Sequence, residues 1–208
     1  MGKDDAVDGL TKGDFTQNPD PWGLFRQWFA DAQVSEPEDP NAMALATSGA
    51  DGLPDVRIVL LKDADERGFV FYTNTLSMKG QELADNPQAA LVMHWKSLRR
   101  QVRARGTVTK VSEAEADAYY ASRPRDSRLG AWASRQSQPL ESRDVLIRAV
   151  DEMRARFPDE AVPRPPHWTG YRIAPVTMEF WQDGAYRLHD RVRFTREGEA
   201  WTGNRLYP

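Results

Sequence analysis

The chain has 208 residues and a mass of 23.6 kDa, with 40% hydrophobic and 28% charged residues, the composition of a globular protein with its own core. It has no cysteine and only three histidines, which excludes disulfides, thiolate metal sites and a cysteine nucleophile, and argues against a histidine-rich metal site. No run of about 18 apolar residues and no charged-then-apolar leader occurs, so we expect a cytoplasmic protein without a membrane span.

The net charge of −3 conceals an uneven distribution along the chain. Residues 1–55 carry 3 basic and 11 acidic side chains, whereas residues 96–135 carry 10 basic and 4 acidic ones. Arginine supplies 22 of the 28 basic residues, and its planar guanidinium binds phosphate through two parallel hydrogen bonds. The arginine-rich centre therefore indicates an anionic ligand, unless it only reflects the codon usage of a GC-rich genome. A pI of about 5.7 indicates no overall basic surface, so we expect no nucleic-acid partner.

The first half of the chain begins with a polar segment and continues with a helix and strands. Residues 1–19 have few apolar side chains, so we expect a loose tail there. Asp20 is a good N-cap and Pro21 suits the first turn, so a helix begins here, with Trp22, Phe25, Phe29 and Ala32 forming its apolar stripe. Three apolar runs separated by turns then predict an antiparallel meander. These runs are 42–47, 56–61 and 69–73.

The second half inserts several helices among the remaining strands. Ser112 and Glu115 form a capping box for a helix that continues to about Ser122, and Pro124 cannot continue it. The other predicted elements are a helix over 77–85, strands over 89–95 and 101–111, helices from about Ser127 and over 143–157, a proline-rich spacer over 158–166, and strands over 170–181, 186–195 and 200–206.

This order of elements predicts the fold class. Six to eight strands joined mostly by short turns favour a mainly β fold with added helices, an antiparallel barrel and not a doubly wound sheet. No GxGxxG motif lies between a strand and a helix, and no phosphate-binding P-loop occurs, so neither of those nucleotide-binding folds is expected. We expect a single domain over residues 20–208, preceded by the tail.

A late strand carries the first candidate anion site. Strand alternation over 187–194 places Arg187, His189, Arg191 and Arg193 on one face. Cationic groups so close together repel one another unless an anion or solvent screens them. Trp181, nearby in the sequence, adds an aromatic surface that suits a flat anionic cofactor. The alternative is an ordinary solvated face of the barrel.

A turn between two predicted helices carries the second candidate. Tyr119, Arg123 and Ser127 offer a phenol, a guanidinium and a hydroxyl at four-residue spacing. Free N–H groups and the positive end of the dipole at a helix N-terminus attract phosphate. Helix capping by Asp126 or Ser127 is the alternative, although it explains only one of the polar residues. Lys62, at the end of an apolar strand, either extends into solvent or faces a ligand.

Several short motifs resemble those of the pyridoxine/pyridoxamine 5′-phosphate oxidase family, from about residue 20 to the C-terminus. The most specific are SRPRDS at 122–127 and RLHDR at 187–191. The others are RIVLLK (57–62), FYTN (71–74), RRQVR (99–103), SRQSQ (134–138), EFWQ (179–182) and the terminal Trp201, Arg205, Leu206 and Pro208. The resemblance implies a homodimeric FMN-binding split barrel with two flavins at the subunit interface. It also implies oxidation of pyridoxine or pyridoxamine 5′-phosphate to pyridoxal 5′-phosphate by O2, with hydrogen peroxide as by-product and ammonia from the amine.

The resemblance also assigns residues to the two ligands. FMN is expected to be bound by Arg57, Ile58, Val59, Leu60, Leu61, Lys62, Tyr72, Thr73, Lys79, Gln101, Gln136, Ser137, Trp181 and Arg191. The phosphorylated substrate is expected to be bound by Lys62, Tyr119, Arg123, Ser127, Arg187, Leu188 and His189. Arg187 and His189 are the expected catalytic residues, covering the pyridine ring. No metal is implied.

The chain departs from the family pattern at three positions. Met78 stands where the family usually has an arginine that reaches the FMN phosphate, and Asp183 and Thr169 stand in place of glycines. Two other functions therefore stay open. One is a related split-barrel flavin oxidase of the phenazine type, a group that shares the late RLH strand but tends to lack SRPRDS. The other is a non-catalytic protein that binds FMN or pyridoxal phosphate.

Overall fold

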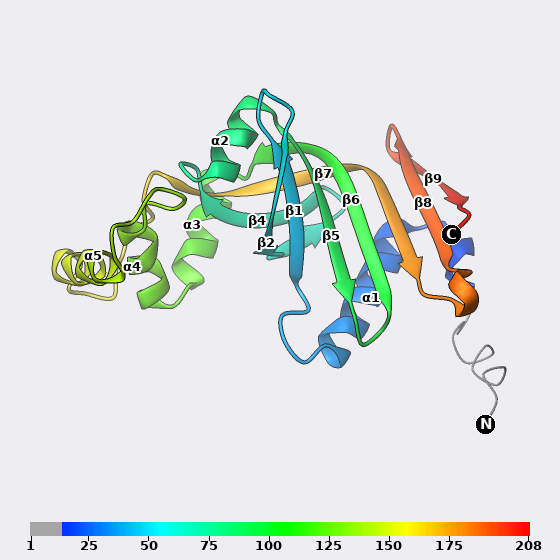
Figure 1. Ribbon diagram of the computed structural model, residues 1–208, viewed down its shortest axis with the longest axis horizontal. Helices are drawn as coiled ribbons and strands as arrows, with labels where there is room; N and C mark the ends of the chain where they lie inside the picture. Colours follow the sequence, from blue (N-terminus) through cyan, green and yellow to red (C-terminus); the bar gives the residue numbers. More distant parts are fainter. Residues whose placement is uncertain (1–13) are drawn as a thin grey trace.

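The computed structural model describes residues 14–208. Its strands form one curled sheet, and several helices lie to one side of it (Figure 1). No helix in this part of the chain is long and apolar enough to cross a membrane. The elements are η2 (Phe15–Gln17), α1 (Pro21–Ser35), β1 (Ala42–Ser48), β2 (Pro54–Leu60), β3 (Asp63–Asp65), β4 (Gly68–Asn74), α2 (Met78–Asp85), β5 (Gln88–Trp95), β6 (Arg100–Lys110), α3 (Glu113–Ser122), α4 (Arg125–Ala133), α5 (Arg143–Arg156), β7 (Trp168–Gln182), η3 (Ala185–Arg187), β8 (Asp190–Glu197) and β9 (Ala200–Arg205).

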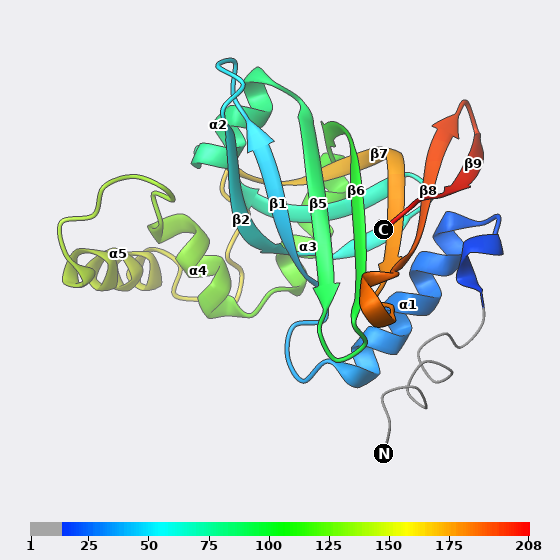
Figure 2. The same cartoon turned by 45° about the vertical axis from the view of Figure 1, so that its right-hand side comes forward.

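Nine strands of the described chain form a single antiparallel sheet. Its order is β2-β1-β5-β6-β7-β4-β3, and β8 and β9 extend from β7. The long β7 pairs with β6 along one edge, while β4 and β8 pair with the first and last parts of its other edge. The register between β6 and β7 shifts at Arg105/Gly106, and such a bulge bends both strands. The sheet therefore curls into an open barrel (Figure 2), which confirms the predicted mainly β fold with added helices.

Helix α1 supplies much of the aromatic core. Asp20 caps it by accepting a hydrogen bond of 2.9 Å from the N–H of Trp22. The ring of Phe25 meets Phe69 of β4 edge-on at 5.1 Å, and Trp28 meets Phe180 of β7 at 5.4 Å. All four of these core side chains are almost fully buried. The apolar stripe predicted for this helix is confirmed, and the helix packs against strands β4 and β7.

The described end of the predicted tail packs on the fold. Phe15 lies in the short helix η2, and its ring contacts Trp28 edge-on at 4.9 Å. Asp14 pairs with Arg205 of β9 at 3.0 Å. Residues 1–13 of the predicted tail lie outside the described residues.

Helices α3, α4 and α5 lie beside the barrel, at one end of the molecule (Figures 1 and 2). The capping box predicted for α3 is present, with Ser112 and Glu115 each bonded to the other's backbone. Helix α4 begins at Arg125, two residues before the predicted start, because Pro124 already turns the chain into the helix. The guanidinium of Arg125 donates to the carbonyl of Asp159 at 3.1 Å, which ties α4 to the proline-rich spacer.

The strand predicted over 186–195 begins only at Asp190. Tyr186 and Arg187 adopt left-handed backbone angles, with φ of 57° and 69°, and such residues cannot continue a strand. Gly184 closes this loop, because a Cβ there would collide with the carbonyl of Leu188. The expectation that Arg187 and His189 share one strand face with Arg191 and Arg193 is therefore wrong. Only the last two residues lie on β8, where they alternate with buried Val192 and Phe194.

Candidate active site

A row of predicted flavin residues crosses three neighbouring strands. Gln101 of β6 lies opposite Trp181 of β7, and Trp181 lies opposite Arg191 of β8. The imidazole of His189 lies 4.7 Å from the Trp181 ring, at an interplanar angle of 47°. Antiparallel register thus brings Gln101, 80 positions earlier in the sequence, beside Trp181 and Arg191, and the row places an aromatic surface between a carboxamide and a guanidinium.

The loop before β8 determines the state of His189. The N–H of Gly184 donates to Nδ1 of His189 at 3.1 Å, so the neutral ring carries its proton on Nε2. Burial lowers the pKa of His189, and the charges of Arg187 and Arg191 lower it further. An oxygen of Asp183 also lies 3.1 Å from Nδ1, and its carboxylate pairs with Arg99. The lowered pKa and the Gly184 N–H favour the neutral ring with its proton on Nε2, whereas the Asp183 carboxylate favours a proton on Nδ1.

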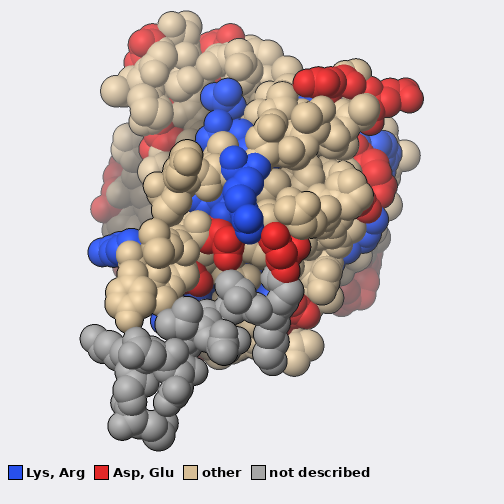
Figure 3. All heavy atoms as spheres, turned by 90° about the vertical axis from the view of Figure 1, so that its right-hand side faces the viewer, with Lys and Arg blue, Asp and Glu red and all other residues tan. Residues whose placement is uncertain are grey.

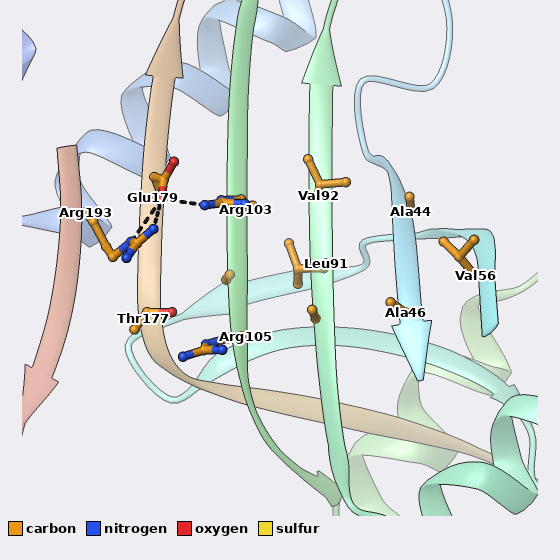
Figure 4. A pocket seen from close by; sticks show the side chains of 12 residues that line it. Ala44, Ala46, Val56, Leu91, Val92, Arg103, Arg105, Thr177, Glu179 and Arg193 are labelled. Carbon is orange, nitrogen blue, oxygen red and sulfur yellow. Dashed lines mark hydrogen bonds and ion pairs between the residues drawn. The ribbon is translucent and has the colours of Figure 1, made fainter. Parts of the chain in front are cut away.

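Glu179 of β7 neutralises the arginines on the outer face of the sheet. Its carboxylate accepts hydrogen bonds from Arg103 at 2.7 Å and Arg193 at 3.0 Å (Figure 4). It also accepts one from Arg191 at 2.7 Å. The residue is only 4% exposed. Burial alone would raise the pKa of Glu179, but the hydrogen bonds from the three guanidinium groups outweigh it and lower the pKa.

The screening of these cations thus comes from within the protein. The sequence predicts an anionic ligand or solvent in that role, and within this chain the carboxylate of Glu179 already pairs with Arg191 and Arg193. The end of the molecule that carries β8 and β9 shows basic and acidic side chains next to one another (Figure 3). A hollow of about 360 Å³ adjoins the cluster, and the side chains of Ala44, Ala46 and Val56 line its far side (Figure 4).

A second group of predicted residues lies where β2 meets α2. Arg57 pairs with Glu82 at 3.0 Å and also bonds to Thr47 and Asp55. Lys79 is buried, and burial followed by the charge of Arg57 lowers its pKa. Asp55 and Glu82 already pair with Arg57, so the buried ammonium of Lys79 is the group here that a bound anion would stabilise most.

The rest of the 57–62 segment alternates between the two faces of the sheet. Val59 is partly buried, whereas Ile58 is 65% exposed and Leu60 is also exposed. Leu61 and Lys62 lie beyond the end of β2, the first buried and the second exposed. Lys62 lines a cavity of about 580 Å³ beside α1. The exposed side chains of Val56, Ile58 and Leu60 thus form an apolar surface on strand β2, at the edge of the sheet.

A third group joins β4 to the turn between α3 and α4. Thr73 donates a hydrogen bond of 3.2 Å to Gln136, and Tyr72 stacks on Tyr119 with ring centroids 4.0 Å apart. Ser137 adopts a left-handed φ of 69° in the loop after α4. These contacts bring three widely separated motifs together.

Arg123 is the most informative member of this group. Its Nη1 is buried and has no hydrogen-bond partner among the described residues. Burial lowers the pKa of Arg123. No side chain caps α4, so helix capping by Asp126 or Ser127 does not explain this motif, and Ser127 lies exposed in the first turn. An unsatisfied guanidinium beside an uncapped helix N-terminus provides donors for a phosphate.

The third group and the loop before β8 do not meet within one chain. The turn between α3 and α4 lies at one end of the long axis, and η3 with the start of β8 lies towards the other (Figure 1). A site that combines Arg123 with Arg187 therefore needs two chains. Glu179 and Trp168 are also members of these clusters, although neither was predicted as a site residue. An acidic residue between the apolar Met178 and Phe180 was a signal that could have identified Glu179.

The sequence of this chain is similar to those of known proteins. A family described as pyridoxamine 5′-phosphate oxidase matches residues 29–157, and the pyridoxine 5′-phosphate oxidase C-terminal dimerisation region matches residues 168–208. The pyridoxine/pyridoxamine 5′-phosphate oxidase of Azorhizobium caulinodans is 62% identical over 96% of this chain and 95% of its own. The enzyme of that name from Brucella canis is 64% identical over 94% of this chain and 97% of its own.

Solved structures agree with this result. PhzG from Burkholderia lata, crystallised with tetrahydrophenazine-1-carboxylic acid, is 34% identical and superposes with a TM-score of 0.89 over 97% of this chain and 99% of its own. An FMN-binding protein from Nostoc punctiforme, related to pyridoxamine 5′-phosphate oxidase, shares the fold at 19% identity, with a TM-score of 0.73 over 92% of this chain and 99% of its own. The family matches and the near full-length identities together show that this chain belongs to the pyridoxamine 5′-phosphate oxidase family.

Proposed function

We propose that this chain is an FMN-dependent oxidase that converts pyridoxine 5′-phosphate or pyridoxamine 5′-phosphate to pyridoxal 5′-phosphate. O2 is the electron acceptor, hydrogen peroxide is released, and the amine substrate also yields ammonia. The observation that carries the proposal is the identity of 62–64% to oxidases of that name over nearly the whole chain. The buried, unpartnered Nη1 of Arg123 supports a phosphorylated substrate.

The residues present fit FMN. Lys79, with Arg57 beside it, is the proposed binding site for its phosphate. The row of Gln101, Trp181 and Arg191 offers an aromatic surface with a polar group on either side. The remaining proposed FMN contacts come from the 58–62 segment, Tyr72, Thr73, Gln136 and Ser137. FMN bound by these residues would supply the redox chemistry, as the acceptor of a hydride from the substrate and the donor of electrons to O2.

The chain's own residues bind and orient the substrate in this proposal. Tyr119, Arg123 and Ser127 bind the phosphate, with Lys62 as a further cation. Arg187 and His189, from the other subunit of a homodimer, position the pyridine ring, with Leu188 beside them. Because Nδ1 of His189 accepts from Gly184, its Nε2–H is the donor available to the polar edge of the ring. Fixing the reacting carbon against the cofactor is the main contribution of the protein to the rate.

The proposed assembly is a homodimer in the cytoplasm, with each active site shared between subunits. The match to a C-terminal dimerisation region supports the pairing. The distance between the two substrate clusters in one chain supports the shared site (Figure 1). Residues 20–208 act as one domain in this arrangement, because β7 belongs to the same sheet as β4, β6 and β8.

The test is aerobic turnover by purified, FMN-loaded protein. We expect pyridoxine 5′-phosphate to yield pyridoxal 5′-phosphate and hydrogen peroxide in equal amounts. Bound flavin without peroxide from either ester would instead favour a binding protein. Oxidation of tetrahydrophenazine-1-carboxylic acid but of neither ester would favour the phenazine-type reaction, which the similarity to PhzG keeps as the second candidate.

Replacing Met78 by arginine is expected to tighten FMN binding about tenfold, because one more charge-assisted hydrogen bond reaches the phosphate. Met78 is 52% exposed and lies next to Lys79 at the start of α2, so the substitution displaces no core side chain. FMN titration of the apoprotein measures the effect. The control is Val34→Arg, which adds the same charge at an exposed position of α1. Equal affinity of M78R and wild type would show that other groups already satisfy the phosphate.

A further inference from the structure

Trp168 lies between the proposed FMN-binding and phosphate-binding residues, and neither set includes it. Its ring is nearly parallel to that of Tyr72, with centroids 5.1 Å apart and an interplanar angle of 11°. The ring of Tyr119 is also nearly parallel to both, with its centroid 4.0 Å from that of Tyr72 and 6.1 Å from that of Trp168. Three aromatic rings thus lie within 20° of parallel, and they connect strand β4, strand β7 and helix α3.

The backbone explains why these rings align. Tyr72 pairs with Gly170 across the β4–β7 ladder, and Trp168, two residues before Gly170, is its diagonal neighbour on the same face. A Cβ at Gly170 would lie only 2.6 Å from Cε1 of Tyr72, so the absent side chain gives the phenol ring its place. Trp168 is 6% exposed, and its carbonyl accepts a hydrogen bond of 2.7 Å from Arg164. The indole is therefore held in one orientation.

The same indole covers the guanidinium of Arg123. The Cζ atom of Arg123 lies 5.0 Å from the Trp168 ring centroid and 5.8 Å from that of Tyr120. No carboxylate pairs with Arg123 among residues 14–208, and its Nη1 has no partner there. The rings of Trp168 and Tyr120 therefore contact this guanidinium, whereas other arginines of the chain, such as Arg191, are paired with a carboxylate. A π face contacts the flat side of a guanidinium and leaves the N–H edge available to an anion.

We propose that Trp168 is a positioning residue that orients Arg123 and Tyr119 to bind the phosphate of the substrate. The inference rests on the proposed function, since that function supplies the phosphate ester. A carboxylate in place of the indole would compete with the phosphate for the N–H groups of Arg123. The indole orients the guanidinium without consuming those donors, so it contributes to selectivity for phosphorylated over unphosphorylated B6 vitamers.

The test compares ligands that differ only in the phosphate. Dissociation constants of pyridoxal 5′-phosphate and of pyridoxal are measured on FMN-loaded wild type, W168F and W168L. We expect W168L to weaken pyridoxal 5′-phosphate about tenfold and W168F about threefold, because phenylalanine keeps a weaker π face. Binding of pyridoxal and retention of FMN are expected to stay unchanged. In turnover, KM for pyridoxine 5′-phosphate rises while kcat changes little.

Two further variants distinguish positioning from general damage. Trp132→Leu removes another Trp–Arg contact, with Arg156 at 4.9 Å, and is expected to leave the affinity for pyridoxal 5′-phosphate unchanged. R123K is expected to resemble W168L, and the double variant to be no worse than either, because both remove the same interaction.

Equal weakening of both ligands, or no weakening of the phosphate ester, would overturn the proposal. If W168L does not fold, W168F provides the test of the proposal. This variant retains a buried ring, and its expected effect is still confined to the phosphate ester. Because binding is measured without turnover, the result is independent of whether the chain proves to be an oxidase.

Discussion

Replacing Arg187 by alanine is expected to lower the kcat for pyridoxine 5′-phosphate about a hundredfold and to leave FMN binding nearly unchanged. Arg187 is exposed in its own chain, in a loop with a left-handed φ of 69°, and belongs to none of the salt bridges of the described residues. Its guanidinium is therefore available to a ligand held mainly by the other subunit. The proposed role of Arg187 is to position the substrate ring. The residues that bind the FMN phosphate do not depend on Arg187, so the affinity for FMN should not change.

Steady-state turnover and FMN titration, measured on the same preparation, check this expectation. Arg196→Ala is the matched control, because Arg196 is an exposed arginine of β8 whose guanidinium donates to the carbonyl of Gly198. R196A is expected to keep wild-type values of both quantities. A parallel loss of FMN and turnover in R187A would show that Arg187 belongs to the flavin site.

Replacing Glu179 by glutamine is expected to lower the free energy of unfolding by about 1–3 kcal/mol near neutral pH. The buried carboxylate is the common partner of Arg103, Arg191 and Arg193. Glutamine keeps the size of the side chain but removes its charge, so three guanidinium groups on neighbouring strands repel one another without compensation. Because Arg103 and Arg193 remain about half exposed, solvent screens part of this repulsion and limits the loss.

The same residue predicts a pH dependence. Its pKa is lowered in the folded chain, so its contribution to stability is complete above the unfolded value of about 4.3 and is lost as the pH falls through the folded pKa. The difference in unfolding free energy between wild type and E179Q should therefore shrink below about pH 4. Urea unfolding at several pH values measures it, with the exposed Glu197→Gln as control. A difference that stays constant down to about pH 3 would contradict the ionic role.

Local signals in the sequence were sufficient for most elements. The capping box at Ser112, the proline at 124 and the apolar alternation of β5 and β6 each act within a few residues, and the structure confirms the elements they predict. The loop at Tyr186 and Arg187 could not be predicted in this way. Neither side chain forbids an extended backbone, and the left-handed turn depends on the close contact between Gly184 and Leu188.

In the candidate site, too, some residues could be predicted from sequence motifs, whereas others depend on contacts between distant parts of the chain. Motif resemblance identified residues that the sheet does bring together, such as Gln101, Trp181 and Arg191. It could not identify Glu179 as the partner of Arg103, because these residues are 76 positions apart and meet only through the β6–β7 register. Trp168 was missed for a similar reason, since its contact with Arg123 depends on how α3 packs against the start of β7.

The placement of Arg123 and Arg187 at opposite ends of one chain has a genetic consequence. Under the proposed pairing, a hybrid of an R123A subunit and an R187A subunit contains one site with both defects and one site with neither. Coexpression of these two inactive variants should then recover about a quarter of the wild-type sites, if subunits associate at random. Two alleles that each abolish activity would complement one another in the same cell.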